Sequence, residues 1–222
     1  MIPVVCIVGA KKTGKTTLME KLIPELRKRG HRVGTVKHDV HDFSIDHEGK
    51  DTWRHRQAGS RTVVISSPGK VAVIKEVSQE MTLSEIVQRF FWEEDIVIAE
   101  GYKNSPFPKI EVLSREKNIV PLCGVKDHLI ATYGGAPEKS EVPHFGYDSV
   151  ESLARLIEDR YLKSRKRRFV SVVADGKNIP LNDFVETIVG NTVEGLLKSL
   201  KGWGSPMQVT ITLLNREATD KE

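Results

Sequence analysis

Residues 3–18 read PVVCIVGAKKTGKTTL, so a short apolar run leads directly into a glycine-rich loop. The loop matches the pattern G-x-x-x-x-G-K-[ST] at every position, through Gly9, Gly14, Lys15 and Thr16. Glycines permit the backbone torsions that turn successive N–H groups toward an anion. The buried strand expected before the loop and the helix expected after it are the context in which this pattern binds phosphate.

We therefore expect this loop to hold the phosphates of a nucleoside triphosphate. Lys15 would bring a mobile positive charge to the β- and γ-phosphates, and it is the first predicted catalytic residue. Thr16 offers a hydroxyl to Mg²⁺, which prefers hard oxygen ligands. The expected nucleotide-binding residues in this segment are Gly9, Lys12, Thr13, Gly14, Lys15, Thr16 and Thr17.

The rest of the first 160 residues alternates β-branched runs with helical patterns, which is typical of a parallel sheet covered by helices. We expect a hairpin from the runs at 62–66 and 71–77. The sequence predicts an α/β fold: a three-layer, mostly parallel sheet like that of phosphate-loop nucleoside triphosphatases. Strands are expected at 3–8, 32–37, 95–99, 109–113, 119–123 and 128–132, and helices at 15–29, 50–58, 82–91 and about 148–163.

The pattern restarts after a basic run at 163–168, in which five of six residues are Lys or Arg. A strand at 169–174, a helix at 182–200 and a strand at 207–214 are expected to follow. We place a domain boundary near residue 166. It separates a phosphate-loop domain, 1–166, from a small α+β strand-helix-strand domain, 167–222, whose role the sequence leaves open.

A second metal-side group is expected at the tip of a neighbouring strand. The apolar run at 96–99 ends in Glu100 and then Gly101. Open α/β sheets bind their ligands at the carboxyl ends of the strands, which is where Glu100 would emerge. Glu100 is therefore the second predicted catalytic residue, holding a Mg²⁺-bound water or orienting the attacking water. The alternative is an ordinary solvated acid at a strand end.

The loop at 37–56 contains four of the seven histidines and several aspartates. A transition-metal site is one interpretation, but the spacing matches none of the compact ligand patterns. A loop over the phosphate site is favoured, with Asp39 or Asp46 reaching Mg²⁺ through water. Arg54 and Arg56 suit a phosphate or another anionic ligand, or else surface ion pairs.

Four segments together resemble the molybdopterin-guanine dinucleotide biosynthesis protein B (MobB) family: 9–17, 35–39, 49–59 and 100–103. The run from Lys50 to Gly59 is the most specific of them, and the resemblance covers about residues 1–160. It implies a dimeric, GTP-binding accessory protein of molybdenum-cofactor maturation that hydrolyses GTP weakly. The implied partners are molybdopterin or the guanylyltransferase that attaches GMP to it.

Guanine recognition is assigned to Asp127. The segment Val125-Lys126-Asp127 is a degenerate form of the Asn-Lys-x-Asp pattern and comes after the strand expected at 119–123. A carboxylate there would accept hydrogen bonds from guanine, so Asp127→Asn would exchange GTP for XTP preference. If Asp127 is instead an ordinary loop acid, GTP over ATP rests on the family resemblance.

Composition bounds the remaining alternatives. Cys6 and Cys123 form no metal-type pair and suggest no disulfide framework, so a reducing cytoplasm is expected. The apolar run at 4–8 is too short to span a membrane. Nucleic-acid binding by the basic run is disfavoured because no aromatic residues interleave it. A small-molecule kinase and a nickel-insertion GTPase remain as alternatives of other classes.

Overall fold

The computed structural model describes residues 2–39, 43–115, 120–163, 170, 172–174, 177–179, 181–204, 209 and 211. The chain divides into two compact units, residues 1–167 and 168–222. This division lies one residue from the boundary expected near 166. Each unit is described by itself.

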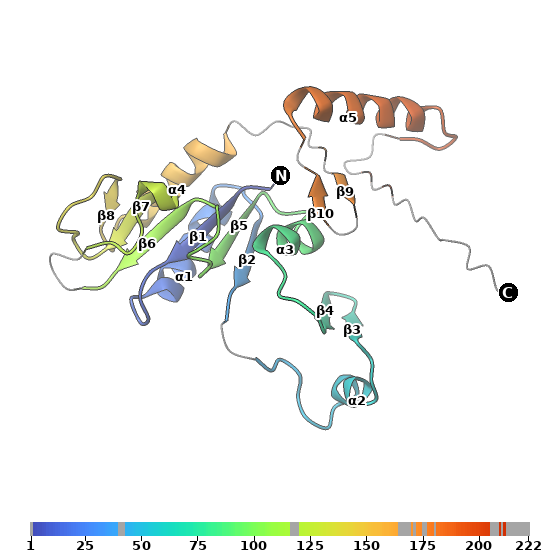
Figure 1. Ribbon diagram of the computed structural model, residues 1–222, viewed down its shortest axis with the longest axis horizontal. Coiled ribbons are helices and arrows are strands. Elements are labelled where there is room, and N and C mark those ends of the chain that lie inside the picture. Colours follow the sequence, from blue (N-terminus) through green and yellow to red (C-terminus); the bar gives the residue numbers. More distant parts are fainter. Residues whose placement is uncertain are drawn as a thin grey trace. The chain divides into compact units, whose positions relative to one another are not determined.

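The first unit is built on a six-stranded sheet with the order β2-β5-β1-β6-β7-β8 (Figure 1). Each neighbouring pair in it is parallel. The phosphate-loop strand β1 therefore lies inside the sheet, between β5 and β6. The strands are β1 (Val4–Val8), β2 (Val33–Lys37), β5 (Ile96–Glu100), β6 (Lys109–Leu113), β7 (Leu129–Gly134) and β8 (His144–Phe145).

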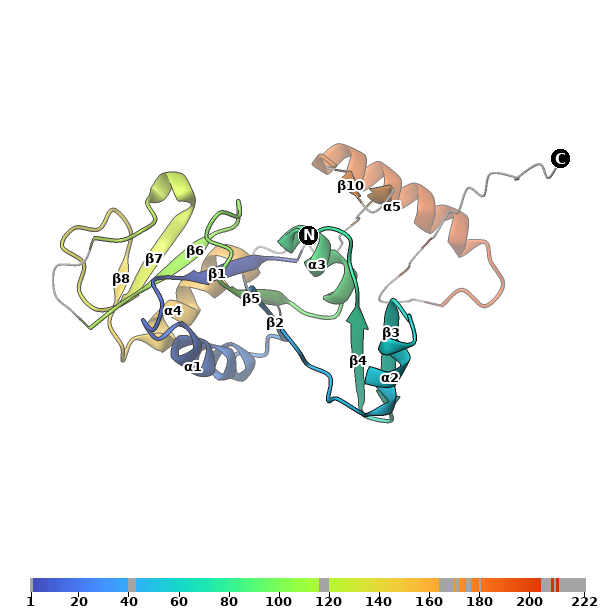
Figure 2. The same ribbon diagram turned by 60° about the horizontal axis from the view of Figure 1, so that its bottom comes forward.

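Helices cover both faces of this sheet. On one face α1 (Lys15–Lys28) and α4 (Val150–Ile157) lie side by side (Figure 2), and their leucines pack on Val5 and Ile7. On the other face α3 (Leu83–Phe90) packs on Val4 and Cys6. Successive side chains of β1 thus point to opposite faces of the sheet and pack into two separate hydrophobic cores. This arrangement confirms the expected three-layer α/β fold. A π-helical turn, Glu158–Leu162, follows α4.

Residues 43–77, which we call the arm, leave the sheet after β2 and return before α3. The arm contains α2 (Asp51–Gln57) and a hairpin of β3 (Thr62–Ser67) and β4 (Lys70–Lys75), as predicted. On this hairpin several large apolar side chains are about half exposed or more, namely Val64, Ile65, Val71 and Val73. The arm therefore presents apolar surface that unit 1 leaves uncovered.

The strand expected at 119–123 is wrong for its described part, residues 120–123, which form no strand. The N–H groups of Leu122 and Cys123 donate to the carboxylate of Glu111 at 2.8 and 2.9 Å. A buried side chain thus takes the hydrogen bonds that a neighbouring strand would have taken. The short strand β8 was not predicted, because two residues carry no readable alternation.

The second unit contains a hairpin of β9 (Val172–Ala174) and β10 (Lys177–Ile179), followed by α5 (Asp183–Lys198). Asn182 caps α5, since its side chain accepts from the N–H of Val185 at 2.9 Å. The strand β10 was not predicted. Apart from Lys163, Val209 and Ile211, the basic run at 163–168 and the strand expected at 207–214 lie outside the described residues. Across the described part of the chain, no helix is both long and apolar enough to cross a membrane.

Candidate functional site

The glycine-rich loop turns sharply between the end of β1 and the start of α1. Gly9 has φ +140°, and a Cβ there would lie 2.5 Å from the carbonyl oxygen of Val112 on β6. Gly14 has φ +98° and stands at the N-terminus of α1, where its carbonyl accepts from the N–H of Leu18. Both positions therefore need glycine, the first because of contact and both because of their torsions.

The loop is held in shape by its own polar groups. The hydroxyl of Thr13 donates to the carbonyl of Ala10 at 3.0 Å. The ammonium of Lys15 donates to the carbonyls of Gly9 and Ala10 at 3.1 and 2.7 Å. Lys12 adopts a left-handed torsion, φ +65°, and is exposed. Thr17 is also exposed, in the first turn of α1. The ammonium thus lies over the loop, within reach of an anion bound there.

Thr16 and Glu100 meet across the sheet edge. The hydroxyl of Thr16 donates to the two carboxylate oxygens of Glu100 at 3.2 and 3.3 Å. Two features produce this contact. The strand β5 pairs with β1 in parallel, which places Glu100 beside Ile7 near the end of β1. The glycine-rich loop then turns the chain, so that Thr16 in the first turn of α1 comes close to Glu100. The hydroxyl and carboxylate oxygens are the hard donors that Mg²⁺ prefers, so the two residues fit a magnesium ion bound with phosphate.

The carboxyl end of β2 lies beside Glu100 at the same edge of the sheet. Lys37 is level with Glu100, and the N–H of His38 donates to the carbonyl of Glu100 at 3.0 Å. Asp39 is the next residue after His38, on the same edge as Glu100. Its expected part in holding Mg²⁺ stays a prediction.

Three residues of the 37–56 loop contact one another inside the arm: Asp46, Thr52 and Arg56. Asp46 is almost fully buried, accepts from the hydroxyl of Thr52 at 2.8 Å and lies 3.9 Å from the guanidinium of Arg56. The expected roles of Asp46 at Mg²⁺ and of Arg56 at an anionic ligand gain no support from these contacts. Arg54 is exposed on α2.

The histidines do not form a transition-metal site among the described residues, where no group of three or more His, Cys, Asp or Glu side chains could hold a metal. His38 instead pairs with Glu80 at 2.7 Å. His41 and Asp42 lie outside the described residues. The nickel-insertion alternative therefore has no ligand set in the described part of the chain.

A buried lysine that the sequence analysis missed anchors the loop after Glu100. Lys109 is only 1% exposed, and its ammonium donates to the carbonyls of Ser105, Phe107 and Asp127. Two residues further on, Glu111 is equally buried and holds the 122–123 segment. Because both residues were expected in a strand, only their charge at buried positions could have revealed them, and burial is not visible in a single sequence.

Asp127 lies at the edge of the sheet opposite the glycine-rich loop, whereas a residue that recognises guanine should lie near that loop. It belongs to a short 3-10 turn, Val125–Asp127, that precedes β7, so it approaches the sheet from the amino ends of β6 and β7. The phosphate loop follows the carboxyl end of β1. The carboxylate of Asp127 accepts from the N–H of Gly124 at 2.9 Å. Its assignment to guanine depended on a strand that residues 120–123, the described part of that segment, do not form, and the assignment stays a prediction.

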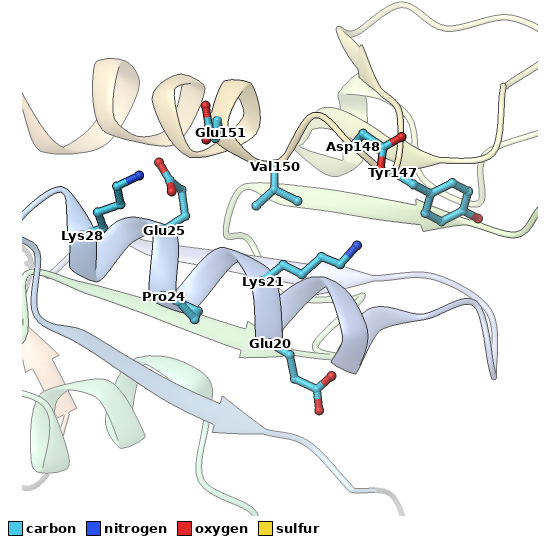
Figure 3. A pocket seen from close by; sticks show the side chains of 9 residues that line it. All are labelled: Glu20, Lys21, Pro24, Glu25, Lys28, Tyr147, Asp148, Val150 and Glu151. Atoms are coloured by element: carbon cyan, nitrogen blue, oxygen red, sulfur yellow. The ribbon is translucent and has the colours of Figure 1, made fainter.

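A cleft of about 480 Å³ lies between α1 and the segment that leads into α4 (Figure 3). Lys21 and Lys28 line it together with Glu20, Glu25 and Glu151, so its charges are mixed. No residue of the glycine-rich loop borders it. The cleft therefore belongs to the packing of α1 against α4 and not to the phosphate site.

Comparison with known proteins shows the family that this chain matches. The profile of the family described as molybdopterin guanine dinucleotide synthesis protein B matches residues 4–133. A molybdopterin-guanine dinucleotide biosynthesis adapter protein from Haemophilus influenzae is 35% identical over 159 residues, which cover 71% of this chain and 89% of that protein. A putative adapter protein of the same description from Methanocaldococcus jannaschii is 28% identical over 235 residues, covering 95% of this chain and 97% of its own length.

Solved structures agree as well. The crystal structure of a molybdopterin-guanine biosynthesis protein B is 31% identical to this chain, with a TM-score of 0.55, and the match covers 70% of this chain and 97% of that one. These matches confirm the resemblance found in four segments of the sequence, and the chain belongs to the molybdopterin guanine dinucleotide synthesis protein B family.

Proposed function

We propose that this protein binds GTP with Mg²⁺, hydrolyses it weakly, and serves as an accessory to the guanylyltransferase step of molybdopterin guanine dinucleotide biosynthesis. The hydrogen bond between Thr16 and Glu100, at the mouth of a complete phosphate loop, is the observation that carries the nucleotide part of this proposal. The pathway is the one named for its relatives, and the family membership supports its transfer to this chain.

Different groups at the glycine-rich loop would bind the phosphates and the magnesium ion. Backbone N–H groups of residues 10–16 and the amino end of α1 would surround the phosphates. Lys15 would exchange its two carbonyl partners for the β- and γ-phosphate oxygens, since an anion satisfies its charge better than neutral carbonyls do. A magnesium ion held by Thr16, with Glu100 through water, would neutralise charge that develops on the phosphates. Glu100 also lies where it could orient a water for hydrolysis.

The arm supports the dimer that the resemblance implies. Its hairpin leaves Val64, Ile65, Val71 and Val73 exposed by 46 to 61% on a two-stranded sheet. An isolated two-stranded hairpin is marginally stable in water and its edges can pair with another chain. We therefore propose self-association of two copies through their arms.

Isothermal titration of the purified protein with GTP and ATP, each with Mg²⁺ or with EDTA, tests the nucleotide proposal. We expect a preference for GTP and a loss of affinity in EDTA. Equal affinity for both nucleotides would remove the guanine preference from the proposal, and no binding of either would overturn it. Molybdopterin titrated into the same protein tests whether the cofactor itself or only the guanylyltransferase is the partner.

A further inference from the structure

One side-chain contact joins the two segments that flank the arm. The ring Nε2 of His38, where the chain leaves β2, lies 2.7 Å from Oε1 of Glu80, where it returns toward α3. The carboxylate of Glu80 is 75% exposed and His38 is 30% exposed. An exposed ion pair contributes little to the free energy of unfolding. The importance of this contact is therefore that it links the segment after β2 to the segment before α3.

The same histidine is joined to the end of β5 in three ways. Its N–H donates to the carbonyl of Glu100 at 3.0 Å. Its Cβ lies 3.3 Å from the point that a Cβ on Gly101 would occupy, so Gly101 lets the two backbones approach. Its ring faces that of Tyr102, with 4.8 Å between the ring centroids.

The segment that receives these contacts is unusual in its backbone. Gly101 and Tyr102 both have left-handed torsions, φ +93° and +55°, directly after Glu100. Such torsions cost energy at a residue other than glycine and persist only where neighbours hold them. His38 packs on Tyr102, so it supports the turn that aims Glu100 at Thr16.

A continuous set of contacts therefore runs from the phosphate loop to the base of the arm, through Thr16, Glu100 and the 101–102 turn to His38 and Glu80. We propose that His38 is a positioning residue that couples nucleotide binding at the loop to self-association through the arm. This inference rests on the proposed function, which supplies the two binding events. Coupling of this kind is reciprocal: if GTP with Mg²⁺ strengthens self-association, self-association strengthens binding of GTP with Mg²⁺ by the same factor.

The test measures the self-association constant by sedimentation velocity, at one pH, with no nucleotide and with saturating GTP and Mg²⁺. In the full-length wild-type chain we expect the constant to change by about fivefold or more. In His38→Ala and in Glu80→Ala we expect the change to fall below about twofold. His47→Ala is the matched control, because His47 is an exposed histidine of the same arm.

The outcomes separate this inference from the proposed function. Wild-type protein that binds GTP and associates, but with an association constant that GTP leaves unchanged, overturns the coupling while the proposed function stands. Coupling that survives in both variants overturns the role of His38. If His38→Ala fails to fold by circular dichroism, Glu80→Ala decides the question, since its carboxylate is largely in solvent. Loss of coupling in His47→Ala as well would also count against it.

Discussion

The hydroxyl of Thr16 lies 3.2 Å from a carboxylate oxygen of Glu100, although 84 positions separate the two residues in the chain. Thr16 lies in α1, which follows β1, whereas Glu100 is the last residue of β5. The contact brings a hydroxyl and a carboxylate to one side of the glycine-rich loop, with the ammonium of Lys15 over the loop's own carbonyls. This arrangement allows separate predictions for the nucleotide and for the metal.

Replacing Lys15 with alanine should weaken GTP binding at least tenfold, or about 1.4 kcal/mol. The ammonium is the group that would meet the β- and γ-phosphates, and its partners in the structure are neutral carbonyls of the loop itself. Isothermal titration with GTP and Mg²⁺ measures the loss. Lys21→Ala, an exposed lysine further along α1, is the control. A folded Lys15→Ala protein with wild-type affinity would contradict the phosphate site.

Replacing Glu100 with glutamine should reduce the dependence of GTP binding on Mg²⁺. The amide is a weaker metal ligand than the carboxylate, while the backbone N–H groups that surround the phosphates are unchanged. We expect affinity in EDTA within about twofold of wild type and a loss of about tenfold in Mg²⁺. A magnesium titration at fixed GTP measures both, with Glu93→Gln, exposed before the opposite end of β5, as the control. An unchanged magnesium dependence would remove Glu100 from the metal site.

Asp127→Asn should leave the ranking of GTP, ATP and XTP unchanged. In the structure its carboxylate accepts from the N–H of Gly124 and precedes β7, away from the carboxyl end of β1. The substitution should also change stability by less than about 1 kcal/mol, because the amide oxygen of asparagine can still accept from the N–H of Gly124. Competition titrations with the three nucleotides decide the matter. A gain for XTP of tenfold or more would show that Asp127 reads guanine after all.

A chain that ends after residue 165 should remain soluble and bind GTP within about twofold of the full-length protein. The buried residues of both sheet faces come from upstream of this point, and residues 168–222 form their own compact unit. Gel filtration and GTP titration of the shortened chain, beside the full-length protein, check this. Aggregation or lost binding would mean that the second unit completes the first.

Acid should destabilise the first unit partly through Glu158. Its pKa is lowered below the usual 4.5 by a hydrogen bond with His31 and by the guanidinium of Arg29. Because the folded pKa is the lower one, this stabilisation is complete above about pH 4.5 and is lost as the pH falls through the folded pKa.

Glu158→Gln should therefore be less stable by about 1 kcal/mol at neutral pH, a difference that shrinks in acid. Urea unfolding between about pH 3.5 and pH 7 measures this, with Glu138→Gln, an exposed glutamate, as the control. A difference that stays constant over the whole range would show that the carboxylate's charge is not what stabilises the contact.

The sequence by itself determined the features that lie within one element or one turn. Gly9, Gly14, Lys15 and Thr16 could be recognised because a phosphate loop needs those residue types at that spacing, with a strand before and a helix after. The hairpin of β3 and β4 could be predicted for the same reason. The capping box of Thr82 with Glu85 and the cap of α5 are equally local. In each case, neighbouring residues in the chain are also neighbours in space.

Only the tertiary structure decided which distant residues meet. The order β2-β5-β1-β6 places Glu100 beside Thr16 and brings His38 to Glu100, and strand order is set by packing of the whole sheet. The sequence predicted Glu100 as a strand-end acid but could not show its partner. It predicted a strand over 120–123 that does not form, because buried Glu111 takes the N–H groups that such a strand would have paired. Lys109 went unnoticed because its burial, and its contact with the carbonyl of Asp127 18 positions away, arise only when the sheet has formed.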